Sequence, residues 1–415
     1  MAGNRASFFE DDEINFVFLI ALGGAYDRVA DVGACLAIAG QIEDGNAGSA
    51  YDAFTAAGAR LAAIADEAAR GGHRVSAREA YMQAANYTFA ATYFADRMGE
   101  PERFAPTWLR HQELWDKSAA LLDPPMEHVA IPYEGTTLPG YLFKADDSGR
   151  RRPLLILNNG SDGGMVAAWT LGAAAALARG YNVLTFYGPG QGLALLERHL
   201  YFRPDWEKVI TPVVDYALDR ANVDPDRIAL LGISQAVHWV PRATAFERRI
   251  AAAIADPGVF DVSTSWTRHL PPEMLALLDG AQQEQFDRFF FEGVDQSTGA
   301  VFAFRSRPYG FASPYETYRA VREYTLAGVV DRIRCPMLIC DPEHEAFWPG
   351  QSQQLSDALS CPKTLVKLTA AEGADLHCEP KAPGLRAQRI FDWLDATLNR
   401  NQDDCGALRW EKATP

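Results

Sequence analysis

A serine lies at the end of an apolar run in the stretch LLGISQAVHWV, residues 230–240. Small residues, Gly232 and Ala236, stand two positions on either side of Ser234. A nucleophile on a tight strand-to-helix turn needs such neighbours, because larger side chains would collide where the backbone doubles back. Ser234 is therefore a candidate nucleophile. The alternative is a serine that caps the N-terminus of the following helix.

A serine hydroxyl needs a base before it can attack a carbonyl, and His377 in AAEGADLHCEP follows the last predicted strand. The base needs an acid that orients the imidazole and stabilises its charged form. The segment CDPEHEAFWPGQ offers Glu345, four residues before Pro349, and Asp341 at the strand end. We select Glu345 as the acid, with Asp341 as the second choice. Nucleophile, acid and histidine then follow in an order known for such sets.

Negative charge develops on the oxygen of an attacked carbonyl, and backbone N–H groups can stabilise it. The amide of Gln235, directly after the nucleophile, is one candidate donor. The loop NNGSDGG after the strand at 153–160 supplies Gly160 and Ser161, because glycines allow the backbone to approach a ligand closely. A glycine-rich loop could also bind phosphate. This loop lacks the G-x-G-x-x-G spacing, however, and the chain has no G-x-x-x-x-G-K-[ST].

Three further residues are candidates for contact with a substrate. Asp162 lies in the same glycine-rich loop, and His238 lies one helical turn beyond Ser234. Trp266 falls in a segment rich in Phe, Leu and Trp, which suits a large apolar or aromatic substrate. His238 and Trp266 are equally consistent with ordinary packing in a core.

Strands that end side by side are needed to bring these residues together. Short apolar runs lie at 153–160, 182–192, 227–234, 250–258, 336–343 and 364–373, with helical segments such as 206–221 between them. This alternation predicts an α/β fold with a doubly wound, mostly parallel sheet covered on both faces. Ligands of such sheets bind beyond the carboxyl ends of the strands, where the candidate residues fall.

Additional modules account for the rest of the chain. Residues 1–124 are predicted to form a helical N-terminal lid or dimerisation module, with Ser76 starting and Gly99 ending one helix. The pattern at 129–143 predicts two strands joined near Glu134 and Gly135, at the start of a catalytic domain over 125–400. The roughly 75 residues before the strand at 336 exceed a simple crossover, so a helical cap is expected at about 259–331. Residues 401–415 are read as a C-terminal tail.

Composition restricts the class of protein and its partners. With 48% hydrophobic and 22% charged residues, the chain resembles a globular enzyme. Its net charge of -15 argues against nucleic acid and anionic membranes as partners. The N-terminus has no signal-peptide pattern and no long apolar run occurs, so we expect a cytoplasmic protein. The six cysteines, including Cys378 beside His377, form no CxxC pair, and we expect neither a metal nor a cofactor.

A known family shares several of these motifs. FYGPGQG, FRPDWEKVITPVVDYAL, GISQA, FWPGQ and EGADLHCEP, with the helical N-terminal module, resemble the α/β-hydrolases that include 2,6-dihydroxypseudooxynicotine hydrolase and fungal polyketide chain-shortening hydrolases of pigment biosynthesis. The resemblance covers roughly residues 10–400. It implies an α/β-hydrolase fold, an N-terminal segment that contributes to the substrate cleft and often to a homodimer, and hydrolysis of a carbon–carbon bond beside a ketone. Ser234 falls on the nucleophile and His377 on the base, whereas Glu345 occupies a position that is usually Asp.

The sequence thus leads to one main hypothesis and two alternatives. The main hypothesis is a serine-dependent hydrolase that cleaves a carbon–carbon bond next to a ketone, or a related acyl bond, in an aromatic or polyketide-like small molecule. One alternative is a non-hydrolytic biosynthetic enzyme that uses the same pocket for cyclisation, acyl transfer or elimination. This alternative draws on the unusual residues Ala236 and Val237 after the nucleophile. The other is a plain carboxylesterase.

Overall fold

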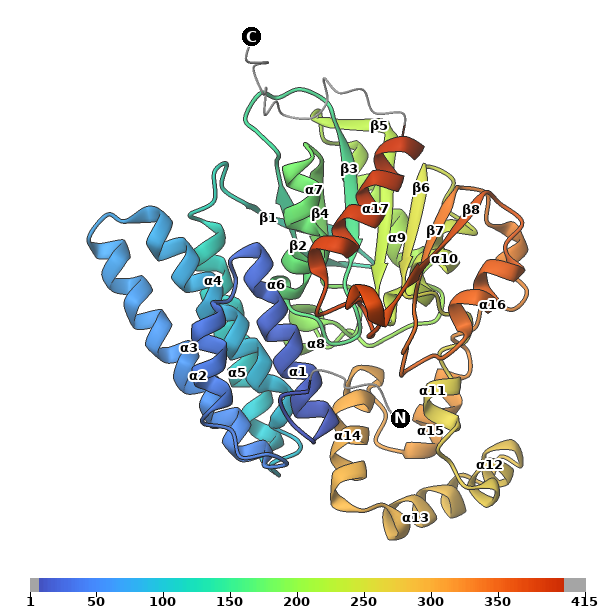
Figure 1. Cartoon of the computed structure of the whole chain (residues 1–415). Helices are drawn as coiled ribbons and strands as arrows, with labels where there is room; N and C mark the ends of the chain where they lie inside the picture. The colour runs from blue at the N-terminus through green and yellow to red at the C-terminus, as the bar shows by residue number, and fades with distance from the viewer. Residues whose placement is uncertain (1–6, 399–415) are drawn as a thin grey trace.

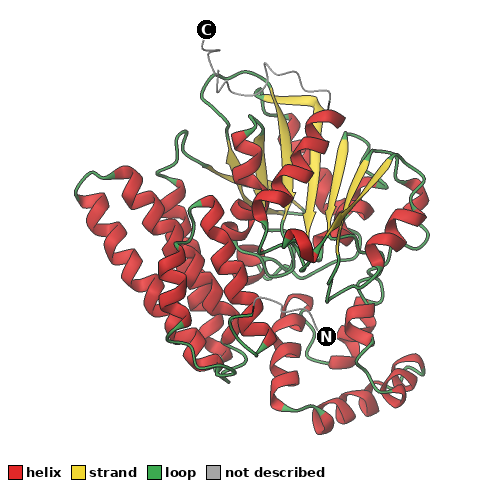
Figure 2. Ribbon diagram, in the orientation of Figure 1, coloured by secondary structure: helices red, strands yellow, loops and turns green. Residues whose placement is uncertain are grey.

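The computed structural model describes residues 7–398, so the predicted tail at 401–415 lies outside the described residues. Figure 1 shows three regions: a group of N-terminal helices, a sheet with helices on both faces, and a group of helices below the sheet. Figure 2 shows the strands gathered in a single layer. None of the helices within residues 7–398 has the length and apolar character of a transmembrane span.

The N-terminal module contains α1 (Asp12–Gly23), α2 (Val32–Ala39), α3 (Ala47–Arg70), α4 (Arg74–Ala91) and α5 (Phe104–Ala119). Carboxylate or amide side chains cap the first three helices by accepting bonds from first-turn amides. The prediction for the ends of α4 is wrong. Ser76 lies inside the helix, because the chain reverses at Gly72 (φ = 75°) and the helix begins immediately afterwards. Gly99 lies beyond the helix end, after a 3₁₀ turn at Thr92–Phe94.

The strands are β1 (Glu127–Tyr133), β2 (Thr136–Phe143), β3 (Arg152–Asn158), β4 (Asn182–Phe186), β5 (Val223–Ile233), β6 (Ala252–Asp256), β7 (Met337–Pro342) and β8 (Lys363–Leu368). Their order is β1-β2-β4-β3-β5-β6-β7-β8, and all neighbours from β4 to β8 are parallel. The predicted hairpin is confirmed. β1 and β2 pair antiparallel around Glu134 and Gly135, which both have positive φ.

Helices cover both faces of this sheet, as expected for a doubly wound fold. They are α6 (Met165–Ala168), α7 (Ala174–Ala178), α8 (Gly192–Leu196), α9 (Glu207–Leu218), α10 (Ala236–Thr244), α16 (Gln351–Ala358) and α17 (Pro383–Thr397). Alternate β3 residues face opposite ways: Leu155 belongs to the core that includes Phe391 of α17, and Ile156 to the core that includes Val213 of α9. The predicted fold class is therefore confirmed.

Between β6 and β7 the chain forms the cap helices α11 (Thr264–Thr267), α12 (Pro272–Asp279), α13 (Gln283–Gly293), α14 (Gln296–Ser306) and α15 (Pro314–Val321). These helices have a small core of their own, made of Met274, Leu278, Phe286, Phe290, Tyr315 and Tyr318. The cap lies below the sheet in Figure 1, near the lower end of α1.

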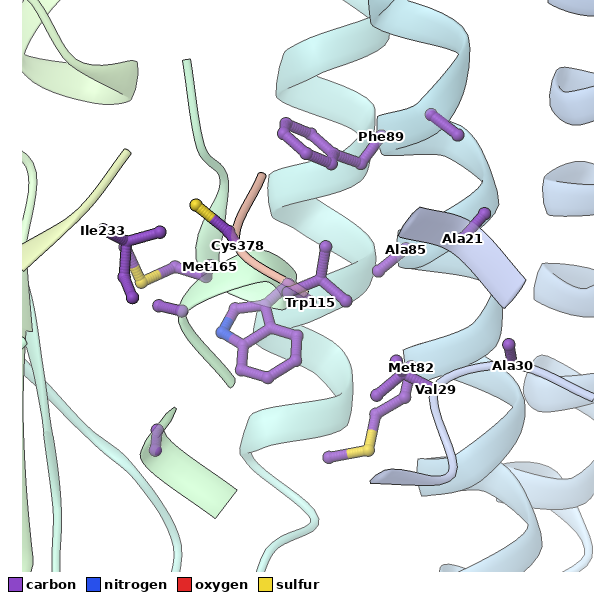
Figure 3. Close-up of a cluster of buried hydrophobic side chains, with 14 of the residues drawn as sticks. Ala21, Val29, Ala30, Met82, Ala85, Phe89, Trp115, Met165, Ile233 and Cys378 are labelled. Atoms are coloured by element: carbon purple, nitrogen blue, oxygen red, sulfur yellow. The ribbon is translucent and has the colours of Figure 1, made fainter. Parts of the chain in front are cut away.

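The N-terminal module shares one hydrophobic core with a face of the sheet. Figure 3 shows Phe89 of α4 and Trp115 of α5 on one side of this core, and Met165, Ile233 and Cys378 on the other. Ile233 and Cys378 directly adjoin Ser234 and His377 in the sequence. Packing of the module thus reaches the backbone that carries both candidate residues.

A stacked tryptophan pair on the opposite face offers a test of the fold. The rings of Trp206 and Trp239 lie 3.9 Å apart and nearly parallel, and Trp206 Nε1 donates to Asn158 Oδ1 at 2.6 Å. Trp206→Ala should lower the free energy of unfolding by about 3–5 kcal/mol, because it leaves a cavity and an unpaired amide oxygen. Urea unfolding measures this loss. Phe291→Ala, at a side chain that is 63% exposed, should change stability by less than about 0.5 kcal/mol. Equal losses of unfolding free energy in the two variants would contradict the role of Trp206 in the core.

Candidate active site

Ser234 occupies the turn between β5 and α10 in a strained backbone conformation. Its φ is 55°, which non-glycine residues rarely adopt. A Cβ atom at Gly232 would lie 2.6 Å from the carbonyl oxygen of Ala236, so the turn requires glycine there. The Ser234 amide donates to the Asp256 carbonyl at the end of β6, at 2.9 Å. No side-chain cap bond occurs at the N-terminus of α10, so the alternative role of Ser234 as a helix cap does not fit.

A chain of hydrogen bonds joins Ser234, His377 and Glu345. His377 Nε2 lies 2.9 Å from Ser234 Oγ, and His377 Nδ1 lies 2.8 Å from Glu345 Oε2. Since a carboxylate accepts, Nδ1 carries the proton, and Nε2 of the neutral ring accepts from the serine hydroxyl. Both His377 and Glu345 are almost fully buried, at 6% and 7% exposed. The structure therefore brings together the predicted nucleophile, base and first-choice acid.

Glu345 is held as an anion by its surroundings. Burial alone would raise the pKa of this carboxyl, but His377 and the backbone amides of Trp348 and Phe347 together lower the pKa below its ordinary value. Its Oε1 accepts from the amides of Phe347 and Trp348 at 2.8 and 3.0 Å. Asp341, the second-choice acid, instead pairs with Lys367 on the neighbouring strand β8.

The glycine-rich loop after β3 is fixed against the serine turn. A Cβ at Gly160 would lie 2.9 Å from the Ser234 Cβ, so the loop backbone touches the candidate nucleophile. Gln191 Nε2 donates to the carbonyls of Asn159 and Gly160, at 2.7 and 2.5 Å. Because a trans peptide is planar, holding the Gly160 carbonyl toward Gln191 turns the Ser161 N–H the opposite way. The Gly160 amide is already bonded to Asn159 Oδ1 at 2.9 Å.

The three predicted substrate-contact residues occupy different environments. His238 is fully buried with its ring 5.8 Å from that of Tyr324, and burial lowers its pKa to about 3. This placement matches the packing alternative for His238. Trp266 is half-buried, with its ring 5.5 Å from that of Tyr309, whose hydroxyl accepts from Gln235 Nε2 at 3.2 Å. Asp162 is half-buried and, together with burial, raises the pKa of Tyr93.

Aromatic residues that the sequence analysis did not single out surround His377. The Phe347 ring lies 4.5 Å from the imidazole, and the Phe16 ring of α1 lies 6.4 Å from it. The Arg305 guanidinium of α14 lies over the ring of Phe347, with its Cζ 5.0 Å from the ring centre. Phe347 belongs to the motif FWPGQ, which gave a signal for this region. Phe16 and Arg305 carried no such signal, because only the tertiary fold brings the module and the cap to His377.

A cavity of about 830 Å³ lies between the N-terminal module and the start of α14. Arg97, which lines it, forms ion pairs with Asp11 at 2.7 Å and with Glu13 of α1 at 3.2 Å. Ser234, His377 and Glu345 are not among its lining residues, so the cavity is separate from the hydrogen-bonded set. Within residues 7–398, no group of three or more His, Cys, Asp and Glu side chains is arranged to hold a metal ion.

Known proteins resemble this chain over nearly its whole length. It is 31% identical to Hydrolase LUC6 of Fusarium sp, over 95% of this chain and 99% of the relative. It is 30% identical to 20-hydroxy-prefusarin hydrolase FUS2 of Gibberella moniliformis, over 95% and 99% of the two chains. The solved structure of 2,6-dihydroxy-pseudo-oxynicotine hydrolase superposes with a TM-score of 0.68 at 22% identity, over 91% of this chain and 95% of the other. No protein-family model matches the sequence.

Two buried carboxyl groups adjoin the hydrogen-bonded set, because the backbone carbonyl of Asp256 accepts from the Ser234 amide and Glu379 follows His377 by two residues. Asp256 and Glu379 are both completely buried, and burial raises the pKa of each. The neighbouring Asp256 raises the pKa of Glu379 further, so the pair retains a proton that two separate exposed carboxyls would lose. The adjacent Arg386 guanidinium donates to the carbonyls of Cys378 and Thr170, at 2.8 and 2.5 Å.

Glu379→Gln should change how stability depends on pH. Folded Glu379 keeps its proton at pH values where the unfolded chain has lost it, so the folded state binds more protons. Stability of the wild type therefore falls as pH rises above about 4.5, the ordinary value for Glu, toward the raised pKa of the folded state. Glutamine cannot ionise, so the variant should lose less stability between pH 5 and pH 8. Urea unfolding at the two pH values measures this, and equal losses in the two proteins would contradict the shared proton.

Proposed function

The chain belongs to the α/β-hydrolase family of its fungal relatives, as its motifs predicted, and from that premise we propose that it is a serine-dependent hydrolase of aromatic or polyketide-like ketones. The bond cleaved is a carbon–carbon bond beside the ketone, or a related acyl bond. The observation that carries the proposal is the hydrogen-bonded chain from Ser234 through His377 to Glu345.

In the proposed reaction His377 Nε2 takes the proton from Ser234 Oγ while the oxygen attacks the substrate carbonyl. The imidazolium that forms is stabilised by the Glu345 carboxylate, which accepts from Nδ1. The low pKa of Glu345 keeps it ionised throughout, and it stays unprotonated when the charge develops. The extra methylene of Glu, compared with Asp, is accommodated because two backbone amides hold its other oxygen.

The amides of Gln235 and Ser161 are the proposed donors to the oxyanion. The Gly160 amide, the other predicted donor in the loop, is bonded to Asn159, so the Ser161 amide is favoured. Gln191 supports this role by holding the Gly160 carbonyl on the opposite side of the same peptide. Two such donors stabilise charge that appears only as the carbonyl is attacked.

The tetrahedral adduct then breaks the bond to the leaving group. For a 1,3-dicarbonyl substrate, the electron pair of the broken carbon–carbon bond becomes part of an enolate, and His377 returns its proton to the leaving carbon. An acyl-phenol would react as its keto tautomer, in which the hydroxyl proton has moved to the ring carbon that bears the acyl group. The electron pair of the broken bond then restores the aromatic ring, and His377 returns its proton to the phenolate oxygen. Water, deprotonated by His377, then attacks the Ser234 ester and releases a carboxylic acid. For an ester substrate the same steps release an alcohol.

The N-terminal module and the cap are proposed to enclose the substrate. Phe16 from the module and Phe347 lie near the imidazole of His377, and Trp266 from the cap packs on Tyr309, whose hydroxyl accepts from Gln235. These rings suit a planar apolar substrate. The predicted homodimer stays a prediction.

A fluorophosphonate probe tests whether Ser234 is activated. The wild type should gain the mass of one probe group, measured by intact-mass spectrometry, because the base and the oxyanion donors favour attack on phosphorus as on a carbonyl. Ser234→Ala should not be labelled, and His377→Ala should be labelled far more slowly. Ser352→Ala, which removes a buried hydroxyl that bonds the Cys340 carbonyl, is a matched control and should be labelled as the wild type is.

A folded wild type that is not labelled would contradict the assignment of Ser234 as nucleophile and favour a cyclase or another non-hydrolytic role. If the wild type is labelled, faster turnover of p-nitrophenyl esters than of any 1,3-diketone would favour a plain carboxylesterase.

Gln191→Leu tests whether Gln191 holds the glycine-rich loop in place. Losing both bonds to the loop carbonyls should let the Ser161 amide move, and losing one oxyanion donor typically lowers kcat by about 10²–10³. Steady-state kinetics on a substrate that the wild type turns over gives kcat and KM separately, and we expect the effect mainly in kcat. Gln191→Glu keeps the size of the side chain but removes the donor, so it should lose kcat similarly. Near-wild-type kcat in both variants would overturn the role of Gln191.

A further inference from the structure

Arg305 places a positive charge close to the base of the proposed reaction site. It belongs to α14 of the cap, and its Cζ lies 5.0 Å from the centre of the Phe347 ring. The same ring lies 4.5 Å from the imidazole of His377. The guanidinium carbon can therefore be no farther from the imidazole centre than the sum of these distances. One small aromatic or diketone substrate can span that separation.

The guanidinium of Arg305 has no hydrogen-bond or ion-pair partner within residues 7–398. No carboxylate in this range lies within 4.0 Å of it, and no hydrogen bond to its side chain occurs there. Glu13 and Asp162 are the carboxylates whose charges act on it most strongly. Glu13 is already paired with Arg97 at 3.2 Å, and Asp162 accepts from the Ser161 hydroxyl at 3.4 Å. An arginine that is mostly removed from water without a partner carries an energetic cost, which a ligand can offset.

Stacking on a ring does not by itself explain an unpaired arginine in this cap. Arg307, two residues further along, also stacks on an aromatic ring, with Cζ 4.2 Å from the centre of Phe104. Its guanidinium in addition donates to both carboxylate oxygens of Asp96, at 2.7 and 2.9 Å. Arg307 thus joins the cap to the N-terminal module. Arg305 stacks in the same way but leaves its N–H donors free.

We propose that Arg305 binds a delocalised oxyanion of the substrate, a carboxylate or the enolate of a 1,3-dicarbonyl group, while the reacting carbonyl lies at Ser234. The proposal deepens the proposed function and rests on it. A guanidinium presents parallel N–H donors that match two oxygens sharing one negative charge. Burial lowers the pKa of Arg305 from its ordinary value, but an arginine side chain stays protonated in a protein. Asp162 opposes the charge of such a ligand and so limits its affinity.

Binding to an inactive variant tests Arg305 without any need for turnover. Ser234→Ala protein is titrated with 3-phenylpropanoate and, separately, with 3-phenylpropanamide, which has the same shape but no charge. Calorimetry should show tighter binding of the acid. Adding Arg305→Met, which retains apolar contact with Phe347, should weaken binding of the acid roughly 10- to 100-fold, the effect of one charged hydrogen bond, and weaken the amide much less. Asp162→Asn in the same background should strengthen binding of the acid.

Arg288→Met is the matched control. Arg288 also lies over a ring of the cap, 5.2 Å from the centre of Phe289, but it is exposed on α13. This substitution should leave the affinities for both ligands unchanged. An acid that binds no better than the amide would overturn the proposal, as would equal weakening of both ligands by Arg305→Met. Failure of the proposed function itself would appear separately, as the absence of fluorophosphonate labelling in a protein that still distinguishes acid from amide.

Discussion

The site depends on one hydrogen bond, 2.9 Å long, between residues 143 positions apart, Ser234 and His377. Each partner is held by backbone that has little freedom to move. Ser234 is locked in a positive-φ turn whose amide bonds to β6, and His377 precedes two further positive-φ residues, Cys378 and Glu379. Both segments are bonded to the end of β6. The Asp256 carbonyl accepts a hydrogen bond from the Ser234 amide and another from the Cys378 thiol, at 3.4 Å. The end of one central strand therefore fixes the separation of the candidate nucleophile and the candidate base.

The N-terminal module is part of this constraint through its packing on the glycine-rich loop. A Cβ at Gly164 would lie 2.4 Å from His111 Nε2 of α5 and 3.0 Å from the Phe89 ring of α4, so loop and module fit together without spare room. His111 is fully buried and its Nδ1 bonds the Ala85 carbonyl, while burial lowers its pKa to about 4. A neutral ring therefore packs there at physiological pH. The loop is clamped between this module on one side and Gln191 on the other, which explains how an irregular segment can hold an amide in place.

Sequence reasoning could locate Ser234 because the steric demands of its turn act on residues only two positions away. The ends of strands likewise predicted where His377 and Glu345 would lie, since parallel strands bring their carboxyl ends to one edge. Gln191 lies in the motif FYGPGQG, but its role could not be predicted, because it depends on carbonyls 31 and 32 positions earlier in the chain. Phe16 and Arg305 could not be found at all. A phenylalanine in an apolar helix and an arginine in a cap follow patterns shared by many packed or exposed residues, and only the assembled fold gives them a common neighbour in Phe347.

Phe347 joins the candidate acid and the aromatic surroundings of His377 into one structural unit. Its backbone amide donates to Glu345 Oε1, and its ring packs on His377. The same ring also lies near the Arg305 guanidinium and near the Phe16 ring, at 6.1 Å. A shift of this loop would change the orientation of the acid and the position of the ring on His377 together. One carboxylate oxygen of Glu345 accepts from His377 while the other accepts from the Phe347 amide, and the Phe347 ring packs on the same imidazole. A substrate that packs against Phe347, as proposed, would therefore also act on the hydrogen bond from His377 to Glu345.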